Sequence, residues 1–388
     1  MADKTKLTRL QTMAKHGDGA CENRMSRRQV LQAGFATIAA GAFSGTFDAL
    51  AQSQDQREAL QGMRAIDIHA HYFPETLLNL IGEEGKPFNA TYRRTEKGFF
   101  IETPVWSGGP ISTRMINLKE RIADMDQQGI AVQAISLTAP MTNWGNAEFS
   151  HKLARTWNDE ASAAHQAHPS RLVSLLTLPM LYPDRAIDEL NRAGKLPGMR
   201  GVYMATNVNN KDLDDPMFEP IWTRIEDLDV PVFLHPVETV GGERLHSFHF
   251  SNLLGTPFDT AVAACHLIFG GVLDRHPKLR ICLSHGGGAL PMVIGRVEHG
   301  WQVHPEIRHT AQPPSAYLQR FTYDTIVHSR SIMEFVIKEV GAERVMIGSD
   351  YCYSMGYDRP VEFLAQIDIS TSQRKMILGG TAARLLKL

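Results

Sequence analysis

The stretch Ala65-Ile66-Asp67-Ile68-His69-Ala70-His71 is the one from which the rest of the chain can be interpreted. It has the composition of a buried strand and ends in two histidines separated by one residue. Side chains two positions apart on a strand point to the same face, so His69 and His71 can direct both imidazoles towards one point. Imidazole is the commonest protein ligand of zinc and similar metals. The pair therefore predicts the floor of a metal site, and the alternative is a pair of partly exposed loop histidines.

The composition of the 388-residue chain is that of a globular protein, with 43% hydrophobic residues, 21% charged residues and a formal net charge of −2. The chain has no long basic run, so nothing in it suggests a nucleic-acid partner. Its four cysteines are too few and too scattered for a disulfide framework or a cysteine-based zinc site. We therefore expect a protein whose partner is a small molecule.

Residues 1–51 are expected to be an export signal. The pair Arg27-Arg28 precedes a mildly apolar stretch rich in Ala and Gly, residues 33–47, and Ala49-Leu50-Ala51 has the small-x-small pattern of a cleavage site. A twin arginine before a weakly apolar stretch resembles a bacterial Tat signal. The alternative is an amphipathic helix or a disordered tail.

Such a signal would leave residues 52–388 as the mature protein, periplasmic or secreted. In this part no apolar run reaches the length that a membrane span needs, so we expect no membrane association after cleavage. Translation could start at Met1 or at Met25, and the second start would give a signal of more usual length.

The pattern after residue 112 alternates between strands and helices. With the opening stretch it predicts eight strands separated by helices, and this count favours a closed α/β barrel, the (β/α)₈ TIM barrel, over an open sheet. The seven later strands are expected at 130–137, 172–178, 201–204, 232–235, 279–285, 321–327 and 345–350.

Residues 74–112 are expected to form a long loop insertion after the first strand, because they are rich in Gly, Pro and polar residues. Loops of this kind often form active-site walls. The aromatic residues Phe99, Phe100 and Trp106 either pin this loop to the barrel or line a pocket.

Polar residues stand where the predicted strands end. His235, His285 and Asp350 each follow an apolar strand, as His69 and His71 do. The carboxyl ends of barrel strands meet at one rim, where barrel enzymes carry their functional residues. Five such groups are hard to explain as satisfied core residues, because burying each of them requires a polar partner.

This order of residues on strands one, five, six and eight resembles the amidohydrolase superfamily, and most closely the amidohydrolase-2 branch that contains aminocarboxymuconate-semialdehyde decarboxylase. The resemblance covers nearly all of residues 64–388. Its segments are 66–71, 231–236, 270–291, Arg296, 348–351 and 379–384.

The resemblance implies a metal site and a proton carrier. The ligands would be His69, His71, His235 and Asp350, which suit one divalent ion, Zn²⁺ first, with Mn²⁺ or Fe²⁺ as alternatives. His285 would be the acid/base residue, and its alternative roles are a fifth ligand or a hydrogen bond that orients Asp350. One ion is expected because the end of strand four offers no Lys or Glu to bridge a second.

The resemblance also implies substrate-binding residues. Arg296 would bind a substrate carboxylate from the neighbouring subunit of a homodimer, and the alternative is a surface salt bridge. Asp324 and His328 would line the pocket. The sequence departs from the decarboxylase at two positions, where Ile101 stands in place of a carboxylate-binding arginine and Val237 in place of a tryptophan. We therefore expect a different substrate.

Two reactions fit these residues. The first is non-oxidative decarboxylation of a small aromatic or unsaturated acid, with His285 assisting. The second is hydrolysis of a lactone, ester or amide, or a hydration, in which His285 or Asp350 accepts the proton. Two pocket arginines facing the metal would favour decarboxylation, and an apolar pocket with one would favour hydrolysis. A non-catalytic binding barrel is disfavoured because all five residues are present.

Overall fold

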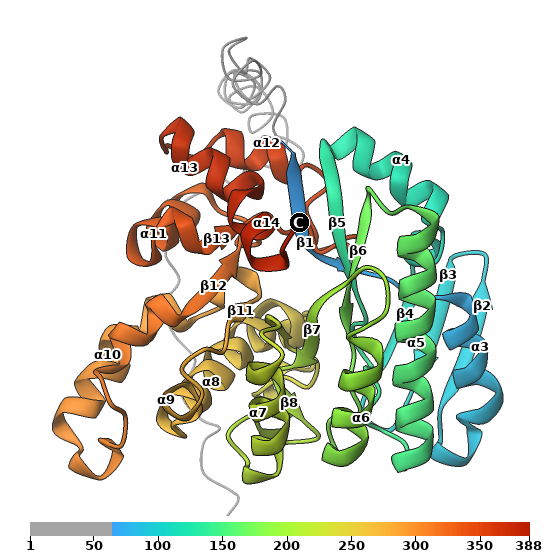
Figure 1. Ribbon diagram of the computed structural model, residues 1–388, viewed down its shortest axis with the longest axis horizontal. Helices are drawn as coiled ribbons and strands as arrows, with labels where there is room; N and C mark the ends of the chain where they lie inside the picture. The colour runs from blue at the N-terminus through green and yellow to red at the C-terminus, as the bar shows by residue number, and fades with distance from the viewer. Residues whose placement is uncertain (1–63) are drawn as a thin grey trace, which may run out of the picture. The chain divides into compact units, whose positions relative to one another are not determined.

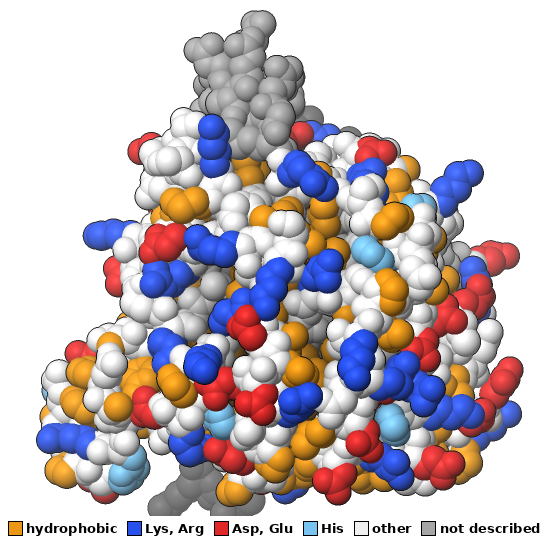
Figure 2. All heavy atoms as spheres, in the orientation of Figure 1, with side chains coloured by type: hydrophobic (Ala, Val, Ile, Leu, Met, Phe, Trp, Pro, Cys, Tyr) orange, Lys and Arg blue, Asp and Glu red, His pale blue; other side chains and the backbone are white. Residues whose placement is uncertain are grey.

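The computed structural model describes residues 64–388, which are coloured in Figure 1. The predicted signal at residues 1–51 and the boundary at residue 52 lie outside the described residues and stay predictions. On the face seen in Figure 2, acidic and basic side chains are interspersed over the surface.

The centre of the fold is an eight-stranded parallel sheet in which sequential strands are neighbours. Each strand pairs with the next because the intervening helix carries the chain back over the outside of the sheet. This arrangement confirms the predicted (β/α)₈ barrel (Figure 1). The strands are β1 (Ala65–His71), β5 (Ile130–Ser136), β6 (Leu172–Leu176), β7 (Met199–Ala205), β10 (Val232–His235), β11 (Ile281–Leu283), β12 (Phe321–Asp324) and β13 (Val345–Met346).

The barrel closes where the segment that follows β13 meets β1. The backbone N–H of Ile68 donates to the carbonyl of Ile347 at 2.9 Å, and the N–H of Asp350 donates to the carbonyl of His69 at 2.8 Å. β13 itself is only two residues long, shorter than the strand predicted at 345–350. The closure therefore depends on the irregular segment that carries Asp350.

The helices that cover the sheet have amphipathic sequences with clear ends. The helix after the insertion, for example, is capped by the side chain of Asn117 and ends at Gly129, whose φ of 73° suits glycine. No helix within residues 64–388 is long and apolar enough to cross a membrane. The helices are α4 (Leu118–Gln128), α5 (Ala147–Ala167), α6 (Pro183–Ala193), α7 (Glu219–Asp227), α8 (Thr256–Phe269), α9 (Val272–Arg275), α10 (Leu290–Val303), α11 (Arg330–Val340), α12 (Pro360–Ala365), α13 (Thr371–Lys375) and α14 (Thr381–Leu386).

The insertion after β1 is not the plain loop that the sequence predicted. It begins with helix α3 (Glu75–Glu84) and continues as an antiparallel sheet of β2 (Thr91–Thr95), β3 (Gly98–Glu102) and β4 (Ser107–Ile111). Phe99 pins this sheet to the barrel, because it is fully buried and its ring lies 5.6 Å from that of Phe73. A second small ribbon, β8 (Asn207–Val208) with β9 (Lys211–Asp212), follows β7.

Candidate metal centre

The four predicted metal ligands lie together at the carboxyl ends of the strands. His69 and His71 come from the end of β1, His235 from the end of β10, and Asp350 from the segment after β13. One ligand atom from each lies within 4.8 Å of the others, and all four residues are buried. The Nε2 atoms of His71 and His69 lie 2.9 Å and 3.6 Å from the same Asp350 oxygen.

The geometry and chemistry of this donor set fit one divalent ion. One ligand atom from each of the four residues lies within 4.8 Å of the others, so small side-chain movements can bring all four onto a single ion. Three imidazoles and a carboxylate suit a transition metal rather than Ca²⁺ or Mg²⁺, which prefer oxygen ligands. The four side chains therefore form a divalent-metal site.

Asp324 orients His69 from behind. Its Oδ2 lies 2.7 Å from Nδ1 of His69, so the imidazole donates there and leaves Nε2 for the ion. The two carboxylate oxygens also accept the backbone N–H groups of His285 at 3.0 Å and Gly286 at 2.8 Å. Asp324 is fully buried and does not line the cavity described below. The structure thus places it as a positioning residue, in contrast to the substrate-binding position predicted from the sequence.

The charges within the cluster are set by burial and by close pairing. Burial would raise the pKa of Asp350, but the hydrogen bond from His71 and the nearby His69 outweigh it and hold that pKa at about 2. Burial lowers the pKa of His71 to about 4 and that of His235 well below its ordinary value. Burial opposes charge on His69 as well, yet the carboxylates of Asp324 and Asp350 raise its pKa.

A buried polar network behind the ligands was not found from the sequence. Asp67 accepts the backbone N–H of His69 at 3.0 Å, the hydroxyl of Ser349 at 2.5 Å and the amide of Gln133 at 2.8 Å. Arg121 of α4 donates to Gln133 at 2.6 Å and to the carbonyl of His71. The available signal was Asp67 within the otherwise apolar start of β1, whereas Arg121 lies among other charged residues of α4 and gave no signal. This network joins β1, β5 and the segment after β13.

His285 stands beside the ligand cluster and faces the cavity. Its ring centre lies 5.3 Å from that of His69 and 5.2 Å from that of His235, and it is not one of the four ligands of the cluster. Its Nδ1 is buried and has no hydrogen-bond partner in the described part of the chain. Burial lowers the pKa of this imidazole. His285 is thus placed to exchange a proton with a bound molecule.

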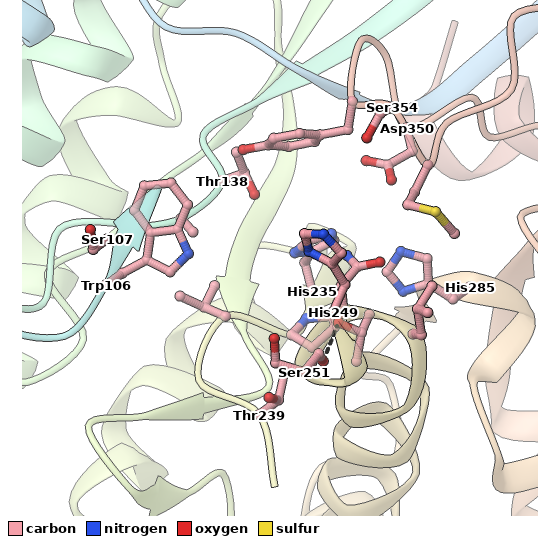
Figure 3. A pocket seen from close by; sticks show the side chains of 18 of the residues that line it. Trp106, Ser107, Thr138, His235, Thr239, His249, Ser251, His285, Asp350 and Ser354 are labelled. Atoms are coloured by element: carbon pink, nitrogen blue, oxygen red, sulfur yellow. Dashed lines mark hydrogen bonds between the residues drawn. The ribbon is translucent and has the colours of Figure 1, made fainter. Parts of the chain in front are cut away.

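A cavity of about 800 Å³ opens in front of the cluster. His235, His285 and Asp350 form its inner end, and Trp106 and Ser107 of the insertion stand on the side opposite His285 (Figure 3). The insertion therefore has both predicted roles, since Phe99 pins it and Trp106 lines the cavity. A smaller cavity of about 230 Å³ shares His285 and Asp350 with the larger one.

The remaining predicted site residues lie at different distances from this cavity. His328 lines the smaller cavity, and its ring centre is 4.7 Å from that of Tyr357. Arg296 is exposed on α10 and lines neither cavity of its own chain. Tyr203 and Tyr353, which the sequence did not identify, face the cluster, with ring centres 5.9 Å and 5.5 Å from that of His71.

Known proteins are similar in sequence to this chain over most of the described residues. The chain is 34% identical over 272 residues to 2-amino-3-carboxymuconate-6-semialdehyde decarboxylase of Dictyostelium discoideum, which covers 69% of this chain and 76% of the relative. It is 27% identical over 349 residues to gamma-resorcylate decarboxylase of Rhodococcus jostii, with 85% of this chain and 99% of the relative covered.

A solved structure shares the fold. The structure of 5-carboxyvanillate decarboxylase from Sphingomonas paucimobilis matches with a TM-score of 0.73 and 24% identity, over 84% of this chain and 100% of that chain. A family model described as amidohydrolase matches residues 66–388, which include β1 and all of the ligands. The chain therefore belongs to the amidohydrolase-2 family, as the order of its strand-end residues indicated.

Proposed function

We propose that this protein is a metal-dependent, non-oxidative decarboxylase of a small aromatic or unsaturated carboxylic acid. The observation that carries the proposal is the position of His285, which stands between a four-ligand metal site and a cavity large enough for a small aromatic acid. The curated relatives described above are named decarboxylases, which supports the same reaction class.

The residues at the inner end of the cavity have different roles in this reaction. Bound at this site, a divalent ion supplies Lewis-acid polarisation of substrate oxygens. The cavity walls hold the substrate so that its carboxyl-bearing carbon faces His285. His285 takes a proton from solvent and passes it to that carbon; the bond from this carbon to the carboxyl carbon breaks, its electron pair remains with the carbon that received the proton, and CO₂ leaves. Asp324 keeps His69 in place through this exchange.

The metal we propose is Zn²⁺, because three imidazoles with one carboxylate are a set that this ion prefers. Two solved relatives, a 5-carboxyvanillate decarboxylase from Novosphingobium aromaticivorans and a dihydroxybenzoic acid decarboxylase from Polaromonas, contain manganese. Mn²⁺ is therefore the alternative. Elemental analysis of protein produced with both metals in the medium distinguishes them, and activity after reloading the chelated protein with each ion provides the control.

Hydrolysis of a lactone, ester or amide, or a hydration, is the second candidate. It is favoured by the absence of lysine and arginine among the described residues that line the cavity, since such a pocket places no fixed cation opposite a carboxylate. Two pocket arginines facing the metal would have favoured decarboxylation, and one chain does not supply them. The decarboxylase relatives outweigh this observation in our proposal.

The decisive experiment measures CO₂ release and acid release in parallel on a panel of hydroxybenzoates and lactones. Decarboxylation predicts CO₂ from an acid of the panel and no acid from the lactones. His285→Asn should lower kcat by about 10²–10⁴-fold while metal content stays stoichiometric. His266→Asn is the control, because His266 pairs with Asp214 and lines neither cavity. Acid release without CO₂ would contradict the proposal, and metal loss in His285→Asn would make His285 a ligand.

We also propose that the protein is exported through the Tat route to the periplasm or medium and acts as a homodimer. The twin arginine at Arg27-Arg28 supports export. The exposed position of Arg296 supports assembly, because this side chain is free to reach a second copy. Cell fractionation with an Arg27→Lys/Arg28→Lys variant tests the first, and light scattering of the mature protein tests the second.

A further inference from the structure

Tyr203 comes from β7, the fourth strand of the barrel, and approaches the metal centre from inside the barrel. In the register of β7 with β10, Tyr203 pairs with Phe233 and Ala205 pairs with the ligand His235. Residues two apart on a strand face the same side, so Tyr203 lies on the face that carries His235, one step deeper. Its side chain is 2% exposed and lines neither cavity. Tyr203 is therefore out of reach of a substrate in the cavity and of a second copy of the chain.

The ring of Tyr203 packs against three of the four ligands. Its centre lies 6.3 Å from that of His69, 5.9 Å from that of His71 and 5.7 Å from that of His235. Its hydroxyl oxygen lies 3.4 Å from Nε2 of His69. This is the nitrogen that His69 offers to an ion, because its Nδ1 donates to Asp324. The hydroxyl is thus directed at the metal site itself.

The hydroxyl of Tyr203 and a metal ion compete for one lone pair. A neutral imidazole whose Nδ1 is a donor has a single acceptor, Nε2, so an ion bound to that nitrogen leaves the hydroxyl proton to another acceptor. Ser136 of β5 is a hydrogen-bonding neighbour of Tyr203. Its own proton goes to the carbonyl of Ala70 at 3.0 Å, so its oxygen is an acceptor. With its proton turned to Ser136, the phenol oxygen presents a lone pair to the ion.

We propose that the hydroxyl oxygen of Tyr203 is a fifth ligand of the divalent ion, on the side that faces away from the cavity. The ion then has three nitrogen donors and two oxygen donors, because Asp350 supplies the other oxygen. The side toward the cavity stays open for the substrate. This inference goes beyond the proposed function and holds for decarboxylation and hydrolysis alike.

A second oxygen donor changes which ions the site prefers, because oxygen ligands suit Mn²⁺ and imidazole suits Zn²⁺. Tyr203→Phe keeps the ring that packs on the ligands and removes the oxygen. We expect this variant to bind Mn²⁺ at least about tenfold more weakly, since even the loss of a partner of a ligand has an effect of that size. Its affinity for Zn²⁺ should fall less. Competition with a chromogenic chelator measures both, and an unchanged affinity for Mn²⁺ overturns the proposal.

Tyr353→Phe is the matched control. Tyr353 also packs on the ligands, with its ring centre 5.5 Å from that of His71, but its hydroxyl is hydrogen-bonded to Thr138. The affinity of this variant for Mn²⁺ should stay close to that of the unaltered protein. An equal loss in both variants would show that any hydroxyl removed beside the cluster weakens the site, and the assignment to Tyr203 would fail.

Spectroscopy of the unaltered protein tests the bond without a variant. A phenol oxygen bound to Fe³⁺ gives a visible charge-transfer band, which imidazole and carboxylate ligands do not give. We expect this band after the metal-free protein is loaded with Fe²⁺ and oxidised in air, and we expect its loss in Tyr203→Phe but not in Tyr353→Phe. A colourless protein with stoichiometric Fe³⁺ overturns the proposal. The decarboxylase proposal would stand in that case, because it is tested separately by CO₂ release.

Discussion

Asp324 shows how one side chain can control a metal site without binding the metal. Its carboxylate accepts from His69 at 2.7 Å and from two backbone N–H groups near His285, so it fixes a ligand and the proton carrier together. Such outer partners of a ligating histidine set the tautomer and the direction of the ring. Loss of this contact should therefore weaken metal binding while all four ligands remain.

We expect Asp324→Asn to weaken metal affinity by about 10–100-fold, measured by competition with a chromogenic chelator. The amide removes the charge that makes His69 a strong ligand. Asp259→Asn is the matched control, because Asp259 is buried too but accepts from Thr206 and Asn207 rather than from a ligand. Its metal affinity should stay unchanged. An equal loss in both variants would indicate general disruption instead of a specific effect on His69.

Metal binding should release about one proton near pH 6, and His69 is its source. Protonation competes with the ion only where the free imidazole is charged. The pKa of His71 is about 4, so it is neutral there, whereas the carboxylates of Asp324 and Asp350 raise the pKa of His69 above its ordinary value. Affinity should rise with pH by about tenfold per unit from above pH 4 and level off beyond the raised pKa. Calorimetry in two buffers of different ionisation enthalpy measures the number of protons released on metal binding. If no proton is released, His69 is not the source that we assign.

The site residues that could be predicted from the sequence depend on local features of the chain, whereas those that were missed depend on how the strands pair. His69, His71, His235 and Asp350 could be predicted because strand alternation and strand ends are local features of the sequence. Asp67 was missed, although it lies on the same face of the strand as His69, because its partners depend on which strands pair. Gln133 is its direct neighbour on β5, and this register is a property of the folded sheet.

At the level of elements, the closure of the barrel depends on Asp67. Its carboxylate ties β1 to Ser349, one residue before the ligand Asp350, and to Gln133 on β5. We expect Asp67→Ala to lower the free energy of unfolding by about 3–5 kcal/mol, because several buried donors lose their acceptor. Urea unfolding of the metal-free protein measures this. Asp126→Ala removes an exposed carboxylate and should leave the stability nearly unchanged; a similarly small loss in Asp67→Ala would show that closure does not depend on it.

The elements themselves were predictable to different degrees. The predicted strand 232–235 has the bounds of β10, because its apolar pattern is strong. The small sheet of the insertion was missed. β2 is a polar strand and β4 contains Gly108, Gly109 and Pro110, so neither shows strand periodicity. Packing of Phe99 and Ile101 in the folded protein stabilises this sheet instead.

At the scale of the whole molecule, the barrel brings together ligands that are far apart in the sequence. His69 and Asp350 are joined by a backbone hydrogen bond across the closure although nearly the whole described chain lies between them. The unfolded chain has no such cluster. An ion that binds the four ligands therefore binds the folded state alone, and its binding free energy adds to the stability of the entire barrel.

Removal of the metal should consequently destabilise the whole protein and not only its activity. With free ion at about 100 times its dissociation constant, the holo form is more stable by about 2.7 kcal/mol, so chelation should lower the melting temperature by a few degrees and re-addition of Zn²⁺ or Mn²⁺ should restore it. His71→Ala provides the control, because a barrel without a complete ligand set should melt at the same temperature with and without chelator. If neither chelator nor added ion changes the melting temperature of the unaltered protein, the metal site is contradicted. The proposed enzyme is then contradicted as well, because the proposed role of His285 depends on a substrate held at that ion.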